Sequence, residues 1–150
     1  MNISQKGIDL IKEFEGFSAS PYLDSVKIPT IGYGTTKYPN GASVKLSDAK
    51  CTKEQAEQWL QNALESFVSD LNRLVKGRVA QNQFDALCSL VYNIGPSAFS
   101  NSTMLKYINA GKLELVPNEF LKWNRAGGQY SQGLMNRRIK EKDLWQTLQE

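Results

Sequence analysis

The sequence predicts an α+β fold that is mainly helical, with a small antiparallel β-sheet lobe joined by a long helix to an all-α lobe. The β-sheet lobe is indicated by residues 17–44, which are rich in Ser, Pro, Gly, Thr and Tyr and poor in helix formers. The long helix is indicated by residues 52–76, where apolar side chains recur every three or four positions without Gly or Pro. The all-α lobe is indicated by the rest of the chain, whose helical stretches are separated by short breaks containing Gly or Pro.

The chain length predicts a single domain, residues 1–150, because this is about the size of one folding unit. Within it we expect a β-containing lobe at 12–51, a connecting helix at 52–76, and an α-helical lobe built from 1–11 together with 77–150. Hydrophobic residues make up 41% and charged residues 22%, which is typical of globular proteins and excludes wholesale disorder. A cleft between two unequal lobes is a usual place for a ligand.

The first helix is predicted at residues 4–15, with Ser4 as its cap and Gly16 as its stop. On a helical wheel the carboxylic acid of Glu15 falls on the apolar side, between Ile8 and Ile11. Loss of hydration there would raise its pKa and make it a proton donor near neutral pH. The alternative is that Glu15 points into solvent from a frayed helix end.

In the β-sheet lobe, the segment from Thr30 to Thr35 has the period-two pattern of a strand, and residues 39–41 form a turn signal. We expect two or three short strands. Thr30, Gly32 and Gly34 would share one face, which the glycines leave uncovered so that a polymer could approach the backbone. The alternative is that the glycines relieve strain at a bulge.

Asp24 lies in a turn-rich stretch and by itself indicates an ordinary turn residue. A second carboxylate near Glu15 is nevertheless what glycoside hydrolysis requires, since that chemistry uses one acid and one base or nucleophile.

The remaining helices are predicted from periodicity and stop signals. The long helix begins with the capping box Thr52-Lys-Glu-Gln55. The others are expected around 84–94, at 103–110, at 113–123 with Pro117 at a first turn or kink, and at 134–148, with a loop at 126–128. On the last helix, Arg137, Arg138 and Glu141 form either a structural ion-pair cluster or a solvated face.

Composition narrows the chemistry. No His is present, which excludes His-based triads and His metal ligands. Cys51 and Cys88 lack the spacing of a zinc site or disulfide framework and are expected to be small apolar residues that are buried or half-buried. The net charge of +3 suits an acidic partner such as a cell-wall polymer, but it does not indicate nucleic acid. No metal or cofactor is expected.

No membrane-spanning segment is expected, because no run of about 18 apolar residues occurs. Asp9, Lys12 and Glu13 interrupt the apolar positions near the N-terminus, so no signal peptide or signal anchor is expected either.

Taken together, several motifs resemble the phage-type lysozymes, the muramidase endolysins. The pattern EGF-x4-Y-x-D is followed by TIGYG, so that Glu15, Asp24 nine residues on and Thr30 six beyond it match the family spacing. The resemblance continues through QNQFDALCSLVYNIG, AFSNSTML, EFLKWNRAGG and GLMNRRIKEKDLW, and covers essentially the whole chain. Two positions depart from the family pattern: Thr35 stands where many members carry His, and Lys27 where relatives often place Gly.

The resemblance implies a lysozyme-like fold and hydrolysis of the β-1,4 bond between N-acetylmuramic acid and N-acetylglucosamine in bacterial peptidoglycan, with inversion, for host cell lysis. It implies that Glu15 is the general acid, that Asp24 is a base or an electrostatic partner, and that Thr30 helps to place the water or lines the floor of the cleft. The substrate-binding residues that it implies are Gly32, Tyr33, Gly34, Tyr92, Asn93 and Ser102.

The resemblance also implies a monomer that acts on glycan strands, binds no nucleic acid, does not insert stably into a membrane, and stays in the host cytoplasm until a holin releases it. Two other functions remain open from the sequence. One is a lytic transglycosylase, which forms a 1,6-anhydro end without water, and the other is a non-catalytic peptidoglycan-binding module. The matching spacing of Glu15, Asp24 and Thr30 argues against both.

Overall fold

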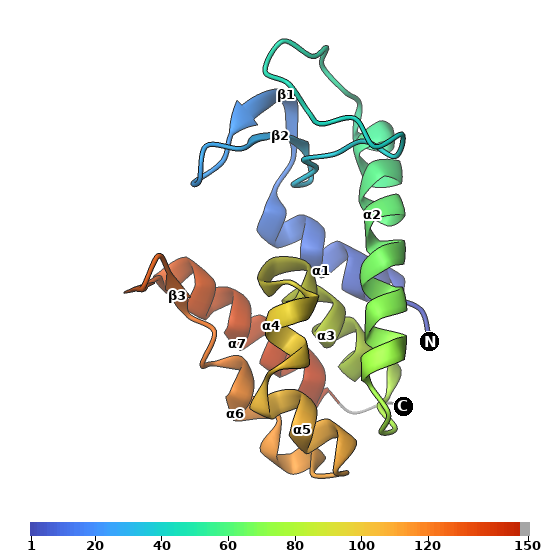
Figure 1. Ribbon diagram of the computed structural model, residues 1–150, viewed down its shortest axis with the longest axis vertical. Helices are drawn as coiled ribbons and strands as arrows, with labels where there is room; N and C mark the ends of the chain where they lie inside the picture. Colours follow the sequence, from blue (N-terminus) through green and yellow to red (C-terminus); the bar gives the residue numbers. More distant parts are fainter. Residues whose placement is uncertain (148–150) are drawn as a thin grey trace. The chain divides into compact units, whose positions relative to one another are not determined.

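The computed structural model describes residues 1–147, and it confirms the predicted class: a mainly helical α+β fold with a small antiparallel sheet (Figure 1). In chain order the elements are α1 (Gln5–Glu15), β1 (Ser18–Leu23), β2 (Pro29–Gly32), α2 (Lys53–Leu74), α3 (Gln81–Ile94), α4 (Pro96–Ser100), α5 (Thr103–Asn109), a 3₁₀-helix (Leu113–Leu115), α6 (Pro117–Phe120), β3 (Arg125–Ala126), β4 (Gln129–Tyr130) and α7 (Gln132–Gln146). No helix within the described residues has both the length and the apolar character that a membrane crossing requires.

Two compact units divide the chain, Asp9–Ser66 and Met1–Ile8 with Phe67–Glu150. We call them the β unit and the α unit. The unit boundaries fall inside α1 and α2, so each helix contributes to both units. The predicted single domain and its three parts stay a prediction.

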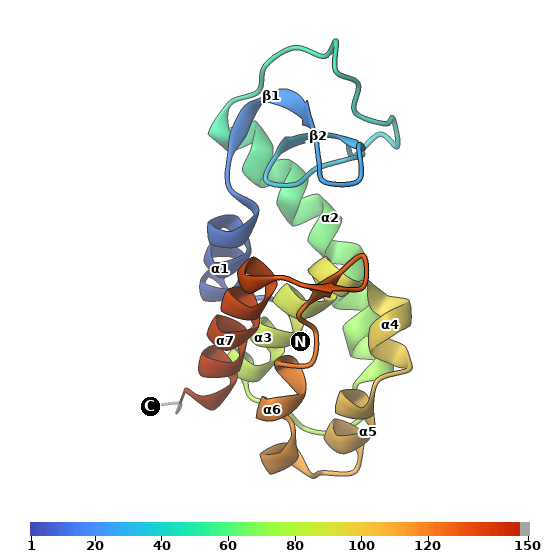
Figure 2. The ribbon, with the colours of Figure 1, turned by 90° about the vertical axis from the view of Figure 1, so that its left-hand side faces the viewer.

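In the β unit, β1 and β2 form an antiparallel hairpin in which Ser18 pairs with Gly32 and Tyr22 with Thr30. The expected sheet of two or three strands is confirmed, and it has two strands. In the residues that follow, the β pairing is limited to isolated bridges. Residues 33–52 then connect β2 to α2 without regular structure (Figure 2). The capping box at the start of α2 is confirmed, because the Thr52 N–H donates to Gln55 Oε1 at 2.9 Å and the Gln55 N–H donates to Thr52 Oγ1 at 3.1 Å.

The face shared by Thr30, Gly32 and Gly34 is not open as the sequence suggested. Gly32 is buried, and a Cβ built on it would lie 2.9 Å from the Cβ of Ala56 in α2. Its φ is +66°, a conformation that side-chain-bearing residues avoid. Gly32 is therefore required because α2 packs directly against this strand.

Replacing Gly32 with Ala is expected to lower the free energy of unfolding by about 3 kcal/mol, because left-handed backbone costs roughly 1–2 kcal/mol and overpacking roughly 1–3 kcal/mol. Gly41→Ala is the matched control, since Gly41 has φ +89° but open space around its Cα. It should lose only about 1–2 kcal/mol. Urea unfolding measures both variants, and equal losses would show that Ala56 leaves room for a side chain.

The core of the α unit is built around α3, nine of whose residues are buried. Helix α7 lies along α3, and the two pack more extensively than any other pair of helices within the described chain (Figure 1). Phe84, Leu87, Leu90, Phe99 and Phe120 are among the fully buried side chains of this core. Burial of these apolar surfaces supplies the main favourable contribution to folding of the unit.

Several predicted boundaries in the α unit need correction. Helix α4 follows directly on the expected stop at Gly95, because Pro96 is well suited to the first turn of a helix. The predicted helix 113–123 is a 3₁₀-helix followed by α6, which Pro117 begins. The predicted loop 126–128 is the tip of the β3–β4 hairpin, where Gly127 and Gly128 both have positive φ. Of the predicted helix 134–148, Leu148 lies outside the described residues.

Both cysteines are buried free thiols, as the sequence predicts. Burial raises the pKa of Cys51 and of Cys88, which keeps both as the less reactive thiol form.

Candidate active site

The three residues predicted to be catalytic all belong to the β unit. Glu15 is the last residue of α1, which ends there because Gly16 adopts φ +68°. Its side chain is half-buried, whereas Glu13 is exposed. A Cβ built on Gly34 would lie 3.2 Å from both Cδ and Oε1 of Glu15, so the absence of a side chain at Gly34 leaves room for the carboxyl group.

Asp24 is held in the turn between β1 and β2. Its Oδ1 accepts hydrogen bonds from the backbone N–H groups of Val26 and Ile28, both at 2.9 Å. The backbone N–H of Asp24 also donates to the carbonyl of Ile28 at 3.0 Å, which closes the hairpin. The turn role that the sequence allowed for Asp24 is therefore present. Oδ2 accepts no hydrogen bond from the part of the chain that the structure describes.

Thr30 lies in β2, directly opposite Tyr22 in the register of the hairpin. Its side chain is buried, with 3% of its surface exposed, and its hydroxyl donates to the carbonyl of Ile28 at 2.9 Å. Because the hydroxyl proton is used in this bond, Oγ1 can act only as an acceptor toward a further group.

Tyr22 is a residue that the sequence analysis did not assign to the site. Together with Glu15, Gly16, Phe17 and Ser18 it lines an open hollow of about 310 Å³. Burial raises the pKa of Tyr22, and the negative charges of Glu15 and Asp24 raise it further. The tyrosine is therefore within electrostatic reach of both carboxylates. Its place in the motif EGF-x4-Y-x-D was the signal that could have identified it.

Tyr33 and Gly34 were predicted to bind substrate alongside Gly32. Tyr33 is buried, with 6% exposed, and its ring packs against Phe17 at a centroid distance of 5.5 Å. The ammonium group of Lys12 lies 5.1 Å from the centre of the same ring. Packing thus explains why Gly32 and Tyr33 are buried. The nearby carboxyl group of Glu15 explains why position 34 carries no side chain. Their binding of substrate stays a prediction.

The other predicted substrate residues belong to the α unit. Tyr92 is half-buried, with its ring edge-on to Phe67 at 5.3 Å. Ser102 is buried and caps α5, because its hydroxyl accepts from the Leu105 N–H at 3.1 Å and donates to the Phe99 carbonyl at 2.6 Å. A hydroxyl that both donates and accepts a hydrogen bond within the protein is poorly suited to bind sugar. The substrate contact of Ser102 stays a prediction.

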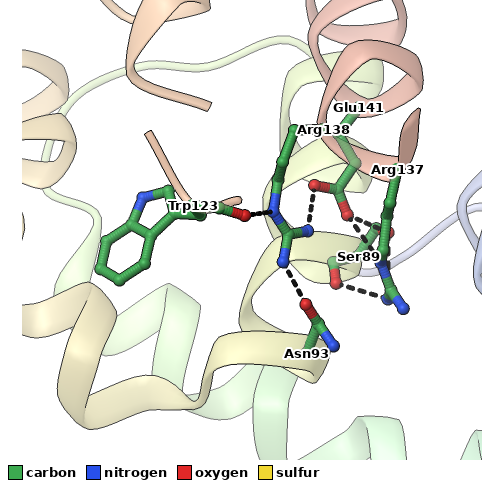
Figure 3. A network of polar contacts seen from close by, with 6 residues as sticks. All are labelled: Ser89, Asn93, Trp123, Arg137, Arg138 and Glu141. Atoms are coloured by element: carbon green, nitrogen blue, oxygen red, sulfur yellow. Dashed lines mark hydrogen bonds and ion pairs between the residues drawn. The ribbon is translucent and has the colours of Figure 1, made fainter. Parts of the chain in front are cut away.

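Asn93, the remaining member of that set, is exposed near the end of α3 and joins a buried polar network (Figure 3). The network centres on Glu141 of α7, which is completely buried. Glu141 forms ion pairs with Arg137 at 3.2 Å and with Arg138 at 2.6 Å. The sequence allowed either an ion-pair cluster or a solvated face for Arg137, Arg138 and Glu141. In the structure they form the ion-pair cluster.

Known proteins match this chain over most of its length. The family model described as "Phage lysozyme" matches residues 12–141. The endolysin of Bacillus phage B103 is 43% identical over 98% of this chain, although the match spans only 55% of that relative's length. The chain belongs to the phage lysozyme family.

Solved structures agree with this assignment. The endolysin from Escherichia coli O157:H7 phage FAHEc1 has a TM-score of 0.91 and 44% identity, covering 97% of this chain and 94% of that one. The muramidase domain of SpmX from Asticaccaulis excentricus has a TM-score of 0.86 and 34% identity, covering 98% of this chain and 99% of that one. The lysozyme-like fold expected from the sequence is confirmed.

The two departures from the phage lysozyme pattern have local consequences. Lys27 has φ +64°, and it is the only described residue other than glycine with positive φ. It thus carries the strain that a glycine would avoid. Thr35 is buried, and its Oγ1 has no hydrogen-bond partner among the described residues, which costs stability. Neither residue replaces Glu15, Asp24 or Thr30.

Among residues 1–147, no group of three or more Cys, Asp or Glu side chains lies close enough together to hold a metal ion.

Proposed function

We propose that this protein hydrolyses the β-1,4 bond between N-acetylmuramic acid and N-acetylglucosamine in bacterial peptidoglycan by carboxylate acid/base catalysis. The observation that carries the proposal is that Glu15 and Tyr22 line an open hollow and that Asp24, two residues after Tyr22, is fixed in the adjoining turn. Glycoside hydrolysis requires two such carboxyl groups near the bond that is cleaved. The membership in the phage lysozyme family and the muramidase domain among its structural relatives support the same chemistry.

In the proposed mechanism Glu15 donates a proton to the oxygen of the leaving sugar. Its carboxyl group is half-buried at the end of α1, and the residue lines the open hollow. The absence of a side chain at Gly34 leaves room for this carboxyl group, since a Cβ there would lie 3.2 Å from its Cδ. Fixed geometry of the donor matters because proton transfer needs hydrogen-bond contact with the leaving oxygen.

Asp24 is proposed to take a proton from the attacking water. The backbone N–H groups of Val26 and Ile28 fix its Oδ1, which leaves Oδ2 to face the water. The Oγ1 of Thr30 is restricted to accepting, so it can hold the other proton of the same water. Attack by a water on the face opposite the leaving group inverts the configuration at the anomeric carbon.

We also propose that the protein acts as a monomer on glycan strands in the manner of an endolysin. It would bind no nucleic acid, remain in the host cytoplasm, and depend on a holin for access to the cell wall. The phage origin of the relatives named endolysin supports this biological role.

The proposed function is tested by Asp24→Asn, which keeps the Oδ1 acceptor for the turn but removes the base. We expect release of reducing ends from purified peptidoglycan to fall by at least about 100-fold, the lower end of what acid/base catalysis contributes. Asp48→Asn is the matched control. Asp48 also accepts a backbone N–H, that of Lys45 at 2.9 Å, but it lies outside the proposed site.

Both variants should retain cooperative thermal unfolding, because Asn preserves one oxygen acceptor at each turn. Full activity of Asp24→Asn, or an equal loss in Asp48→Asn, would contradict the role of Asp24. A wild-type protein that binds peptidoglycan but releases no ends would instead indicate a non-catalytic binding module.

A further inference from the structure

The turn between β1 and β2 carries an exposed apolar surface directly beside a proposed catalytic carboxylate. We propose that Val26, Lys27 and Ile28, which we call the hairpin tip, bind the peptide stem that N-acetylmuramic acid carries in peptidoglycan. This inference rests on the proposed function. It goes beyond that function by assigning a second part of the substrate, an acidic peptide with small apolar side chains, to a surface beside Asp24.

Exposed apolar side chains are concentrated in this part of the hairpin. Among residues 1–147, nine large hydrophobic side chains are exposed, and four of them lie between positions 22 and 28: Tyr22, Leu23, Val26 and Ile28. Val26 is the most exposed of the nine, at 69%. Single exposed apolar residues need no explanation, but a group of them usually marks a surface that binds a ligand or a partner.

The register of the hairpin places Ile28 on the same face as the proposed catalytic residues. Tyr22 pairs with Thr30. Two residues closer to the turn, the Asp24 N–H donates to the carbonyl of Ile28 at 3.0 Å, so these two residues stand opposite each other. Because side chains alternate between the faces of a strand, positions 22, 24, 28 and 30 share one face. The exposed side chain of Ile28 therefore lies beside the carboxylate of Asp24.

Hydrogen bonds hold the hairpin tip in a fixed shape. The Lys27 N–H donates to the Asp24 carbonyl at 3.0 Å, and the N–H groups of Val26 and Ile28 donate to Asp24 Oδ1. This is a three-residue hairpin loop in which the last residue has positive φ, here Lys27 at +64°. A lysine costs stability there, and backbone strain of this kind is concentrated at binding and catalytic sites. A surface that is fixed before binding also loses less conformational entropy when it binds.

The charge and apolar character of the hairpin tip fit the peptide stem. The Lys27 side chain is exposed, and its ammonium group forms no ion pair with a carboxylate of residues 1–147. The stem is linked through the lactyl group on O3 of N-acetylmuramic acid, and it carries alanine methyl groups and free carboxylates. One ring carbon separates C3 from the C1 atom that Asp24 would serve, so the stem begins within reach of this surface. Its methyl groups suit Val26 and Ile28, and its carboxylates suit Lys27.

The inference predicts faster cleavage of glycan strands that carry stems. One substrate is soluble peptidoglycan strands with their stems. The other is the same strands after an amidase has removed the stems and methylamine has been coupled to the lactyl carboxylates, so that both substrates keep an amide at this position. We expect kcat/KM of the wild-type protein to be at least about fivefold higher with stems, because stem contact buries apolar area and adds an ion pair. Equal values would overturn the inference.

Lys27→Gln and Ile28→Thr test whether the hairpin tip is the surface that binds the stem. Each should lower the ratio of the two kcat/KM values by about two- to fivefold, because one removes the charge and the other an apolar contact. Lys50→Gln is the matched control, since Lys50 is an exposed lysine of the β unit outside the hairpin, and it should leave the ratio unchanged. A wild-type ratio in either hairpin variant, or an equal fall in Lys50→Gln, would overturn the inference.

Lys27→Gly separates loss of binding from loss of folding. Glycine tolerates the positive φ at this position, so the thermal midpoint should rise by about 2–4 °C while the ratio falls as it does in Lys27→Gln. A Lys27→Gly variant that is folded and keeps the wild-type ratio would overturn the inference.

Failure of this inference is distinguishable from failure of the proposed function. A wild-type protein that releases no reducing ends from either substrate rejects the proposed function, and the inference with it. A wild-type protein that cleaves both substrates with equal kcat/KM rejects the inference alone. Sedimentation gives one further outcome, because a dimer that Ile28→Thr dissociates would assign the hairpin tip to a second copy of the chain and overturn the inference.

Discussion

Replacing Glu15 with Gln is expected to reduce peptidoglycan turnover by at least about 100-fold, because glutamine keeps the shape of the side chain but cannot donate the proton. Glu15 is the proposed general acid because its carboxyl group is half-buried at the end of α1 and because it matches the family spacing. Initial rates of reducing-end release from purified peptidoglycan measure the effect, with the thermal midpoint as the test of folding.

Glu13→Gln is the control for this experiment. Glu13 lies two residues earlier on α1, about 200° around the helix, and its side chain is exposed. Its replacement should change turnover by less than about twofold, within the small effects usual for surface substitutions. A larger loss in Glu13→Gln than in Glu15→Gln would overturn the assignment of the acid.

Replacing Glu141 with Gln is expected to lower the free energy of unfolding by about 3–5 kcal/mol, the usual cost of removing one partner from a buried ion pair. Glu141 has no exposed surface and is paired with two guanidinium groups. Its neutral replacement would leave two buried positive charges close together without a carboxylate between them (Figure 3). Urea unfolding, followed by circular dichroism, measures the loss.

The control is Glu114→Gln, because Glu114 is exposed in the 3₁₀-helix of the same unit. It should change the free energy of unfolding by no more than about 0.5 kcal/mol. If Glu141→Gln were equally mild, the cluster would contribute little to stability, and its contact with Asn93 would need another explanation.

Local patterns predicted much of the fold. The helix ending at Gly16 and the capping box at Thr52 were recoverable because their signals lie within a few residues of the structure that they determine. The apolar periodicity of residues 52–76 likewise predicted α2 to within two residues. Glu15 could be singled out for the same reason, since its position on the helical wheel depends only on its neighbours in the chain.

Features that depend on contacts distant in sequence were not recoverable. The face of Gly32 looked open because nothing near it in sequence indicates that Ala56 packs against it. The burial of Ser102 and Tyr33 depends in the same way on packing partners that a periodic pattern does not identify. The contact between Arg138 and Asn93 joins residues 45 positions apart, and the charge pattern of α7 alone could not distinguish a buried cluster from a solvated face.

The most direct test of the central claim is the mass of the ends that the wild-type protein creates in purified peptidoglycan. An acid/base pair that activates water predicts hydrated, reducing N-acetylmuramic acid at every new end. A lytic transglycosylase would leave 1,6-anhydro ends that are lighter by one water. Reducing ends in wild-type digests, lost in Glu15→Gln, are the result that this account predicts, and anhydro ends would contradict it.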